Sequence, residues 1–503
     1  MKTSSVALLS LAGMLVSSVA VYSTSWIGPG KSGDAPATSP QSAPESAGLA
    51  PPESAPGDSI NPARFSAGSR LLIDGRVGHA RIAQGTPSET FVLLEVRSAE
   101  GAAENASAPS NLALVIDRSG SMKGNRLKNA IRAAKGALDS LKDGDVVSVV
   151  AFDTRPTIVV PSTVVGPDSR ERVRSAIEAI NLGGDTCISC GVEEGARQIQ
   201  QTAGKVNRMI VLSDGDATDG VRDVPGFQRL AEQTRDRGVS VTTIGVDLAY
   251  NQKILATLAQ GSGGRHYFVE DEAALARAFA SEAERLKATV ASDAEASVEL
   301  GEGVELAQVF DRSFRKEGRR IVVPLGTFAP GDIKTVLLRV RVPAKTGERA
   351  TIADVSLRYR DLREGKDERA TGSLGVVLAE SATGASAIDG DVQKRLARGE
   401  TAAALLLAND LFEQGKPDEA RRVIEEHKKS LEVQAESASK STDAPKRAEL
   451  EKDFKGQYAD LDSASAGYGA GKAKAAGGAK PSDTPEGRRA VRVIQEAANP
   501  YKE

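Results

Sequence analysis

Cysteine, histidine and aromatic residues are scarce in this sequence. Only two of its 503 residues are cysteines, three are histidines, and aromatic residues make up 4%. Two thiols alone make a poor zinc site. The sequence also lacks a His-Glu-x-x-His motif, a nucleophile elbow and a dinucleotide fingerprint in the strand and helix context that such motifs require. We therefore expect a protein that is not an enzyme.

Net charge is also nearly absent. The chain has 65 Lys and Arg residues against 68 Asp and Glu residues, which leaves a formal charge of -3. Nothing in this balance favours a nucleic-acid partner or a polybasic membrane patch. At this length the chain is too long for one hydrophobic core, so we expect two to four domains of about 100–200 residues each.

The N-terminus has the pattern of an export signal. Lys2 is followed by an apolar run from Val6 to Val21, with small residues at 18–20. We interpret residues 1–22 as a signal peptide or an N-terminal membrane anchor. Residues 23–63 are rich in Pro, Ser and Ala, and we expect a disordered tether. The predicted location is therefore outside the cytoplasm, either periplasmic, at the cell surface or membrane-anchored.

Residues 109–288 alternate apolar runs with amphipathic segments, which is typical of a doubly wound, mostly parallel α/β sheet. Its predicted strands are Leu112–Ile116, Val146–Phe152, Met209–Leu212, Val239–Val246 and His266–Val269. The predicted helices include the stretch from Leu127 to Leu141 and the segments Ser169–Ile180, Ser189–Thr202, Phe227–Arg237, Gln252–Ala259 and Glu272–Leu286.

The segments on either side of this α/β domain have different patterns. Residues 64–108 and 289–380 contain short strand-like runs between turn residues, and we expect them to form an accessory β-sandwich. Residues 388–460 fit a helical hairpin, with a break at Gln414–Pro417. Residues 461–503 are rich in Gly, Ala and Lys at their start, and we expect a mostly disordered tail.

The segment with the clearest chemistry is Asp117-Arg118-Ser119-Gly120-Ser121, which directly follows a predicted buried strand. In an open α/β sheet the carboxyl ends of parallel strands form the edge where ligands bind. Asp117 supplies a negative charge there, and Ser119 and Ser121 supply hydroxyl oxygens. An Asp-x-Ser-x-Ser string by itself is equally explained by helix capping, so it needs further support.

Two other loops supply that support. Thr186 follows a glycine-rich turn, and Asp214 follows the predicted strand Met209–Leu212. This order of motifs resembles the metal-ion-dependent adhesion site of von Willebrand factor A (VWA) domains, over roughly Asn111 to Leu286. The resemblance implies a Rossmann-like fold and a metal site made by Asp117, Ser119, Ser121, Thr186 and Asp214. It also indicates bacterial and inter-alpha-inhibitor-like proteins as members with a comparable architecture.

The predicted ligands are all oxygens, which suits hard cations such as Mg²⁺, Ca²⁺ or Mn²⁺. Because only two of the five ligands carry charge, a bound cation would remain electrophilic and keep a coordination position open. The expected partner is a protein that offers an Asp or Glu carboxylate. A metal-free set of loops is the alternative.

The neighbouring residues allow more than one interpretation. Cys187 and Cys190 either form a local disulfide beside Thr186 or are small buried residues at a helix start. Arg118 either faces solvent, pairs with a carboxylate or orients an acidic ligand. We expect His266 to pack in the core and His427 to lie on a solvated helix face.

Three rival functions compete with metal-dependent adhesion. The first is a scaffold or assembly factor that acts through the C-terminal helices. The second is a non-catalytic partner of a separate ATPase, since the chain has no complete phosphate-binding loop of its own. The third and weakest is a metal-dependent hydrolase, which would need a general base that the motifs do not supply.

Overall fold

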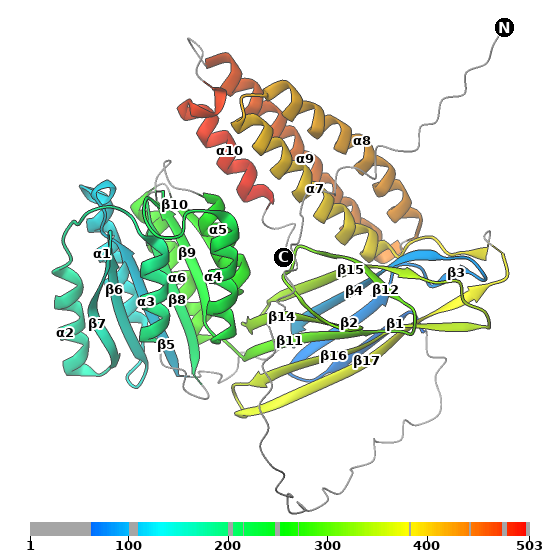
Figure 1. Ribbon diagram of the computed structural model, residues 1–503, viewed down its shortest axis with the longest axis horizontal. Coiled ribbons are helices and arrows are strands. Elements are labelled where there is room, and N and C mark those ends of the chain that lie inside the picture. Colours follow the sequence, from blue (N-terminus) through cyan, green and yellow to red (C-terminus); the bar gives the residue numbers. More distant parts are fainter. Residues whose placement is uncertain are drawn as a thin grey trace, which may run out of the picture. The chain divides into compact units, whose positions relative to one another are not determined.

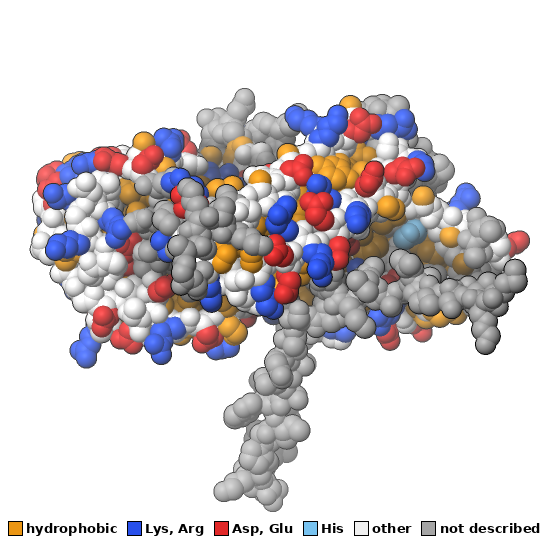
Figure 2. Space-filling view, turned by 90° about the horizontal axis from the view of Figure 1, so that it is seen from above, with side chains coloured by type: hydrophobic (Ala, Val, Ile, Leu, Met, Phe, Trp, Pro, Cys, Tyr) orange, Lys and Arg blue, Asp and Glu red, His pale blue; other side chains and the backbone are white. Residues whose placement is uncertain are grey.

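The computed structural model describes residues 62–99, 109–199, 205–214, 216–246, 252–269, 271–381, 384–441, 444–474 and 480–498. The expected signal or anchor at 1–22 and all but the end of the expected tether lie outside these residues. All described elements belong to the unit Ile60–Glu503. No helix within the described ranges is both long and apolar enough to cross a membrane. Lys, Arg, Asp and Glu side chains intermingle over the face in Figure 2, as the balanced composition suggests.

The α/β domain is a six-stranded sheet with helices on both faces (Figure 1). The strands follow the order β10-β9-β8-β5-β6-β7; all neighbours are parallel except β6 and the antiparallel edge strand β7. The strands are β5 (Ser110–Asp117), β6 (Val146–Phe152), β7 (Pro156–Val164), β8 (Val206–Ser213), β9 (Ser240–Val246) and β10 (His266–Val269). The helices are α1 (Asn125–Ser140), α2 (Pro167–Glu178), α3 (Ile188–Gln198), α4 (Val224–Asp236), α5 (Gln252–Ser262) and α6 (Glu272–Lys287).

The central strands β5, β6 and β8 are buried along their whole length, which explains their near-continuous apolar sequence. Apolar residues of α1, α2 and α6 pack on one face of the sheet, and those of α3, α4 and α5 pack on the other. The sheet is therefore a rigid layer whose strand ends hold fixed positions. This is the doubly wound, mostly parallel α/β fold predicted from the sequence.

Two further sheets form a β-sandwich around one shared core. One sheet has the order β1-β2-β4-β15-β12, and the other β13-β14-β11-β16-β17-β3. The segment before the α/β domain enters both sheets, because β4 pairs with β15 over ten residues and β3 pairs with β17. The strands are β1 (Arg64–Gly68), β2 (Leu71–Val77), β3 (Arg81–Ala83), β4 (Ser88–Ser98), β11 (Ala291–Leu300), β12 (Glu305–Phe310), β13 (Arg315–Glu317), β14 (Arg320–Phe328), β15 (Ile333–Val342), β16 (Arg349–Asp361) and β17 (Lys366–Ala379).

The C-terminal region is more extensive than the expected hairpin. It contains α7 (Gly390–Glu413), α8 (Pro417–Ser441), α9 (Ala444–Lys474) and α10 (Pro485–Ala498), which share one apolar core. The prediction of a mostly disordered tail at 461–503 is wrong, because α9 continues to Lys474 and α10 follows. The small residues that suggested disorder allow close helix packing: the Cα of Gly467 faces Ala490 with little room for a side chain.

Neither of the two histidines of uncertain role lies where the sequence predicted. His266 is half-buried and not part of the core; its Nδ1 lies 2.8 Å from Thr243 Oγ1, and burial, with the nearby Arg492, lowers its pKa to about 4. His427 does not lie on a solvated face. Its Nε2 is 2.8 Å from Thr401 Oγ1 on the neighbouring helix α7, and burial lowers its pKa to about 4.

Candidate metal centre

The two predicted carboxylates lie at the ends of neighbouring parallel strands. Asp117 is the last residue of β5, and Asp214 directly follows β8, the strand paired with β5. Ser119 and Ser121 belong to the turn between β5 and α1, and Thr186 lies just before α3. The sheet topology therefore brings residues from three separate stretches of chain to the same edge.

Asp117 is completely buried. Its Oδ1 accepts a hydrogen bond from the Ser119 backbone N–H at 2.8 Å, and its Oδ2 accepts one from the Ser213 hydroxyl at 2.6 Å. Burial raises the pKa of this carboxyl to about 6, although the hydrogen bonds from Ser119 and Ser213 act in the opposite direction. A buried carboxylate with these fixed donors is held in one orientation and gains from a nearby positive charge.

The two serines connect Asp117 to Asp214. The Ser119 and Ser121 hydroxyl oxygens are 3.0 Å apart, and the Ser121 hydroxyl donates to Asp214 Oδ1 at 2.6 Å. Burial raises the pKa of Asp214, against the effects of Ser121 and Arg126. Four of the five predicted ligands thus form one connected hydrogen-bond network.

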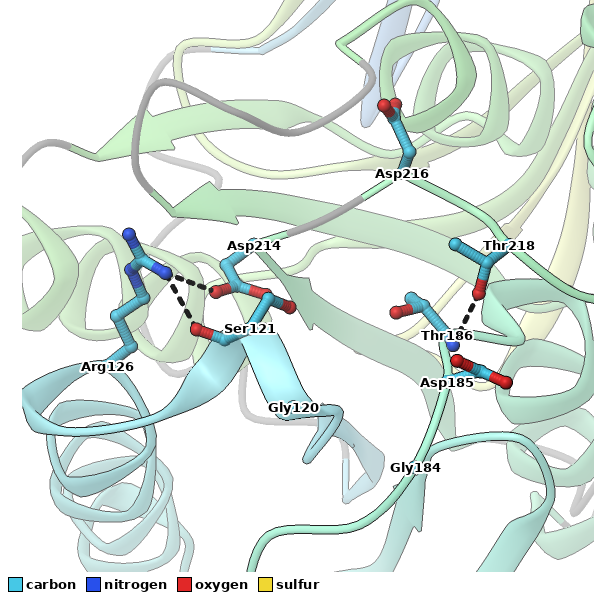
Figure 3. Close-up of a pocket in the computed structure, with 9 residues that line it drawn as sticks. All are labelled: Gly120, Ser121, Arg126, Gly184, Asp185, Thr186, Asp214, Asp216 and Thr218. Carbon is cyan, nitrogen blue, oxygen red and sulfur yellow. Dashed lines mark hydrogen bonds and ion pairs between the residues drawn. The ribbon is translucent and has the colours of Figure 1, made fainter.

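Thr186 completes the set from the other side of a pocket of about 360 Å³. Its side chain points toward Ser121 and Asp214, which line the same pocket (Figure 3). The Thr186 backbone is anchored to the loop that follows β8. Its N–H donates to Thr218 Oγ1 at 2.9 Å, and its carbonyl accepts from the N–H groups of Thr218 and Asp219.

Backbone contacts also join the first two loops. The Gly120 N–H donates to the Gly184 carbonyl at 2.9 Å, and the Gly183 N–H donates to the Arg118 carbonyl at 2.7 Å. Cys187 and Cys190 form a disulfide immediately after Thr186. These links fix the three loops relative to one another before any ligand binds.

Two arginines lie beside the predicted ligands. Arg118 forms an ion pair with Asp153 at 2.9 Å. Of the three roles considered for Arg118, the structure therefore shows pairing with a carboxylate. Arg126, which the sequence analysis missed, extends from the first turn of α1 to Asp214 Oδ2 at 3.1 Å and to the Ser121 carbonyl at 2.7 Å. A cation in the first turn of a helix is electrostatically unfavourable, and this is the one sequence signal that could have indicated a special role for Arg126.

The donor set fits a hard divalent cation. It consists of two carboxylates and three hydroxyls, all oxygen ligands of the kind that Mg²⁺, Mn²⁺ and Ca²⁺ take. Within the described ranges no three His, Cys, Asp or Glu residues cluster as a metal site. An ion at this edge would therefore have mostly neutral ligands, which leaves it electrophilic.

Residues 111–281 match the family model of the von Willebrand factor type A domain. Among solved structures, the chain resembles a von Willebrand factor type A protein of Catenulispora acidiphila, with a TM-score of 0.61 and 19% identity over 75% of this chain and 88% of that one. It also resembles the ArnB paralog VWA2 of Sulfolobus acidocaldarius, with a TM-score of 0.58 and 17% identity over 86% and 98% of the two chains. These likenesses concern the fold.

Sequence relatives cover smaller parts. An uncharacterised protein of Synechocystis is 27% identical over 51% of this chain and 63% of its own length. The human inter-alpha-trypsin inhibitor heavy chain H4 is 28% identical over 31% of this chain and 18% of its own length. This chain thus spans less than two thirds of these relatives.

Proposed function

Because residues 111–281 form a von Willebrand factor type A domain, we propose that this protein is an exported, non-catalytic binding module that holds an acidic side chain of a partner protein through a divalent cation. Domains of this family typically mediate protein interactions. The inter-alpha-trypsin inhibitor heavy chains that this chain resembles are generally non-catalytic. The main support for metal dependence is the network that links Asp117, Ser119, Ser121 and Asp214.

The residues of the site have distinct roles in this proposal. Asp117 and Asp214 supply the negative charge, and Ser119, Ser121 and Thr186 supply neutral oxygens. A bound divalent cation, Mg²⁺ in the first instance, would supply a position that accepts one oxygen of the partner's carboxylate. The fixed loops hold these five groups in place, so little conformational entropy is lost when a partner binds.

Export is part of the proposal and rests on the N-terminal segment. The apolar run after Lys2 supports a signal peptide or an anchor. The Cys187–Cys190 disulfide agrees with an oxidising compartment. Fractionation of cells followed by N-terminal sequencing of the mature protein tests this part: a protein found in the cytoplasm with its first residues intact would contradict it.

The metal-dependent part is tested with Ser119→Ala, which removes one hydroxyl ligand and keeps both carboxylates. We expect divalent-ion binding, measured by calorimetry, to weaken at least about tenfold because a ligand is lost. Partners retained from envelope fractions in Mg²⁺ should be released by EDTA and should not be retained by the variant.

Ser140→Ala is the matched control, because the Ser140 hydroxyl donates to the Ala137 carbonyl in the last turn of α1, at the end of that helix far from the site. It should bind ions and partners like the unaltered protein. Retention of the same partners in saturating EDTA would contradict the proposed mechanism.

A further inference from the structure

Arg126 places a fixed positive charge directly against the predicted ion ligands. The Asp214 side chain has no exposed surface, and its two oxygens have separate donors: Ser121 on Oδ1 and Arg126 on Oδ2. The guanidinium is also held by the Ser121 carbonyl at 2.7 Å. Arg126 therefore contacts both a predicted ligand and the backbone of a second one (Figure 3).

Helix stability does not explain this arginine. Arg126 is the second residue of α1, and no acidic residue accompanies it in the first turn. The backbone N–H groups at a helix N-terminus favour negative charge, so a guanidinium there opposes the helix dipole. Its position is instead explained by Asp214, whose buried carboxylate needs a counter-charge.

The sum of the charges at the site affects both the binding of the cation and the binding of a carboxylate. Among the predicted ligands, Asp117 and Asp214 carry two negative charges, and Arg126 offsets one of them; Asp185 and Asp216 also line the pocket but are exposed, where salt screens their charge. An incoming divalent cation must share Asp214 with the guanidinium and is repelled by it. With the cation in place, the cation, its two carboxylate ligands and Arg126 together carry one positive charge, which one carboxylate from outside neutralises.

We propose that Arg126 is a specificity-determining residue that weakens the hold of the site on the free cation and strengthens the hold of the loaded site on a carboxylate. This proposal rests on the metal-dependent function above and deepens it. It makes ion binding and partner binding mutually supporting: a carboxylate ligand relieves the repulsion between the cation and the guanidinium. An ion should accordingly bind more tightly in the presence of an acidic ligand.

The test compares Arg126→Gln with the unaltered protein by calorimetric titration of Mn²⁺, alone and with acetate as a minimal carboxylate probe. Because a unit charge acts strongly on a divalent ion at such short range, we expect Arg126→Gln to bind Mn²⁺ about tenfold more tightly. Acetate should enhance Mn²⁺ binding in the unaltered protein and have a smaller effect in the variant. Arg126→Lys, which keeps the charge, should resemble the unaltered protein.

Arg132→Gln is the matched control on the same helix. Arg132 pairs with Glu272 at an exposed position, where salt screens its charge, so its removal should leave Mn²⁺ affinity unchanged. Equal Mn²⁺ affinities of the unaltered protein and Arg126→Gln would overturn this inference and leave the proposed function standing. If neither the unaltered protein nor Arg126→Gln binds any divalent ion at millimolar concentration, the proposed function is overturned, and this inference is overturned too.

Discussion

A buried ion pair between Glu282 and Arg208 offers a sharp test of what holds the α/β domain together. The Glu282 side chain has no exposed surface, and that of Arg208 is 7% exposed. Glu282 Oε2 accepts from Arg208 Nη1 at 2.9 Å and from the Thr242 hydroxyl at 2.7 Å, and Oε1 accepts from the Tyr267 hydroxyl at 2.8 Å. The carboxylate thus joins α6 to three neighbouring strands.

Glu282→Gln removes the negative charge and leaves the Arg208 guanidinium buried without its counter-charge. Removal of one partner of a buried pair costs about 3–5 kcal/mol. Taking about 3 kcal/mol, the melting temperature of a domain of this size should fall by roughly 6–12 °C. The assay is thermal unfolding at pH 7 followed by circular dichroism.

Glu284→Gln is the control, since Glu284 lies two residues away on the same helix and forms an exposed pair with Lys287. It should change stability by less than about 1 kcal/mol. If Glu282→Gln and Glu284→Gln melt together, the buried pair does not stabilise the domain and the reasoning fails.

The Glu282 carboxylate also predicts a pH dependence. Burial acts to raise its pKa, but Arg208 and the hydroxyls of Thr242 and Tyr267 outweigh this and hold the pKa below its usual value. Its contribution to stability is therefore present above the unfolded pKa of about 4.3 and is lost as the pH falls through the lower folded value. Glu282→Gln should lose less stability than the unaltered protein between pH 5 and pH 3.

Three further predictions concern other parts of the molecule. Burial lowers the pKa of Lys334 to about 7, so the unfolded chain binds more protons above that pH and stability should rise by up to about 1.4 kcal/mol per pH unit between pH 7 and 10. Denaturant titrations should show this rise in the unaltered protein and not in Lys334→Met. Cys187→Ser with Cys190→Ser opens a four-residue disulfide loop and should cost about 2 kcal/mol. A melt that is the same with and without this disulfide would contradict that estimate. Gly220→Ala should cost about 2–4 kcal/mol, because the new Cβ would lie 2.5 Å from Cys187 Sγ at a φ of 67°. Gly85→Ala, at a φ of 72° with open space around it, isolates the backbone part and should cost less when both are measured by chemical denaturation.

The parallel sheet was predictable because its central strands are buried on both faces and read as apolar runs. The antiparallel strand β7 was not predicted, because Pro156 and Pro161 bracket its short apolar run Ile158–Val160 and this edge strand is only partly buried. The C-terminal helices were misjudged for a related reason. Tyr468 is fully buried, and its hydroxyl donates to Asn409 at 2.7 Å, but the Gly and Ala residues around it resemble a flexible tail in composition.

The predicted ligands came from motifs, and motifs specify which residues follow a strand. They do not specify which distant side chain folds back onto them. Asp117, Ser119 and Asp214 were accessible to sequence reasoning because each lies within two residues of a strand end. Arg126 was not, since its contact with Asp214 spans 88 residues and depends on how α1 lies against the sheet.

Arg208 and Asp214 lie near opposite ends of β8. The buried ion pair is therefore at the amino ends of the parallel strands, and the candidate metal site is at their carboxyl ends. Six residues of strand separate them by about 20 Å at ~3.3 Å per residue, which is beyond the range where substitutions normally interact. Glu282→Gln should therefore lower the melting temperature and leave Mn²⁺ affinity at 20–25 °C unchanged, while Arg126→Gln should raise Mn²⁺ affinity. A loss of ion affinity in folded Glu282→Gln would show instead that the sheet transmits strain between the two ends of its strands.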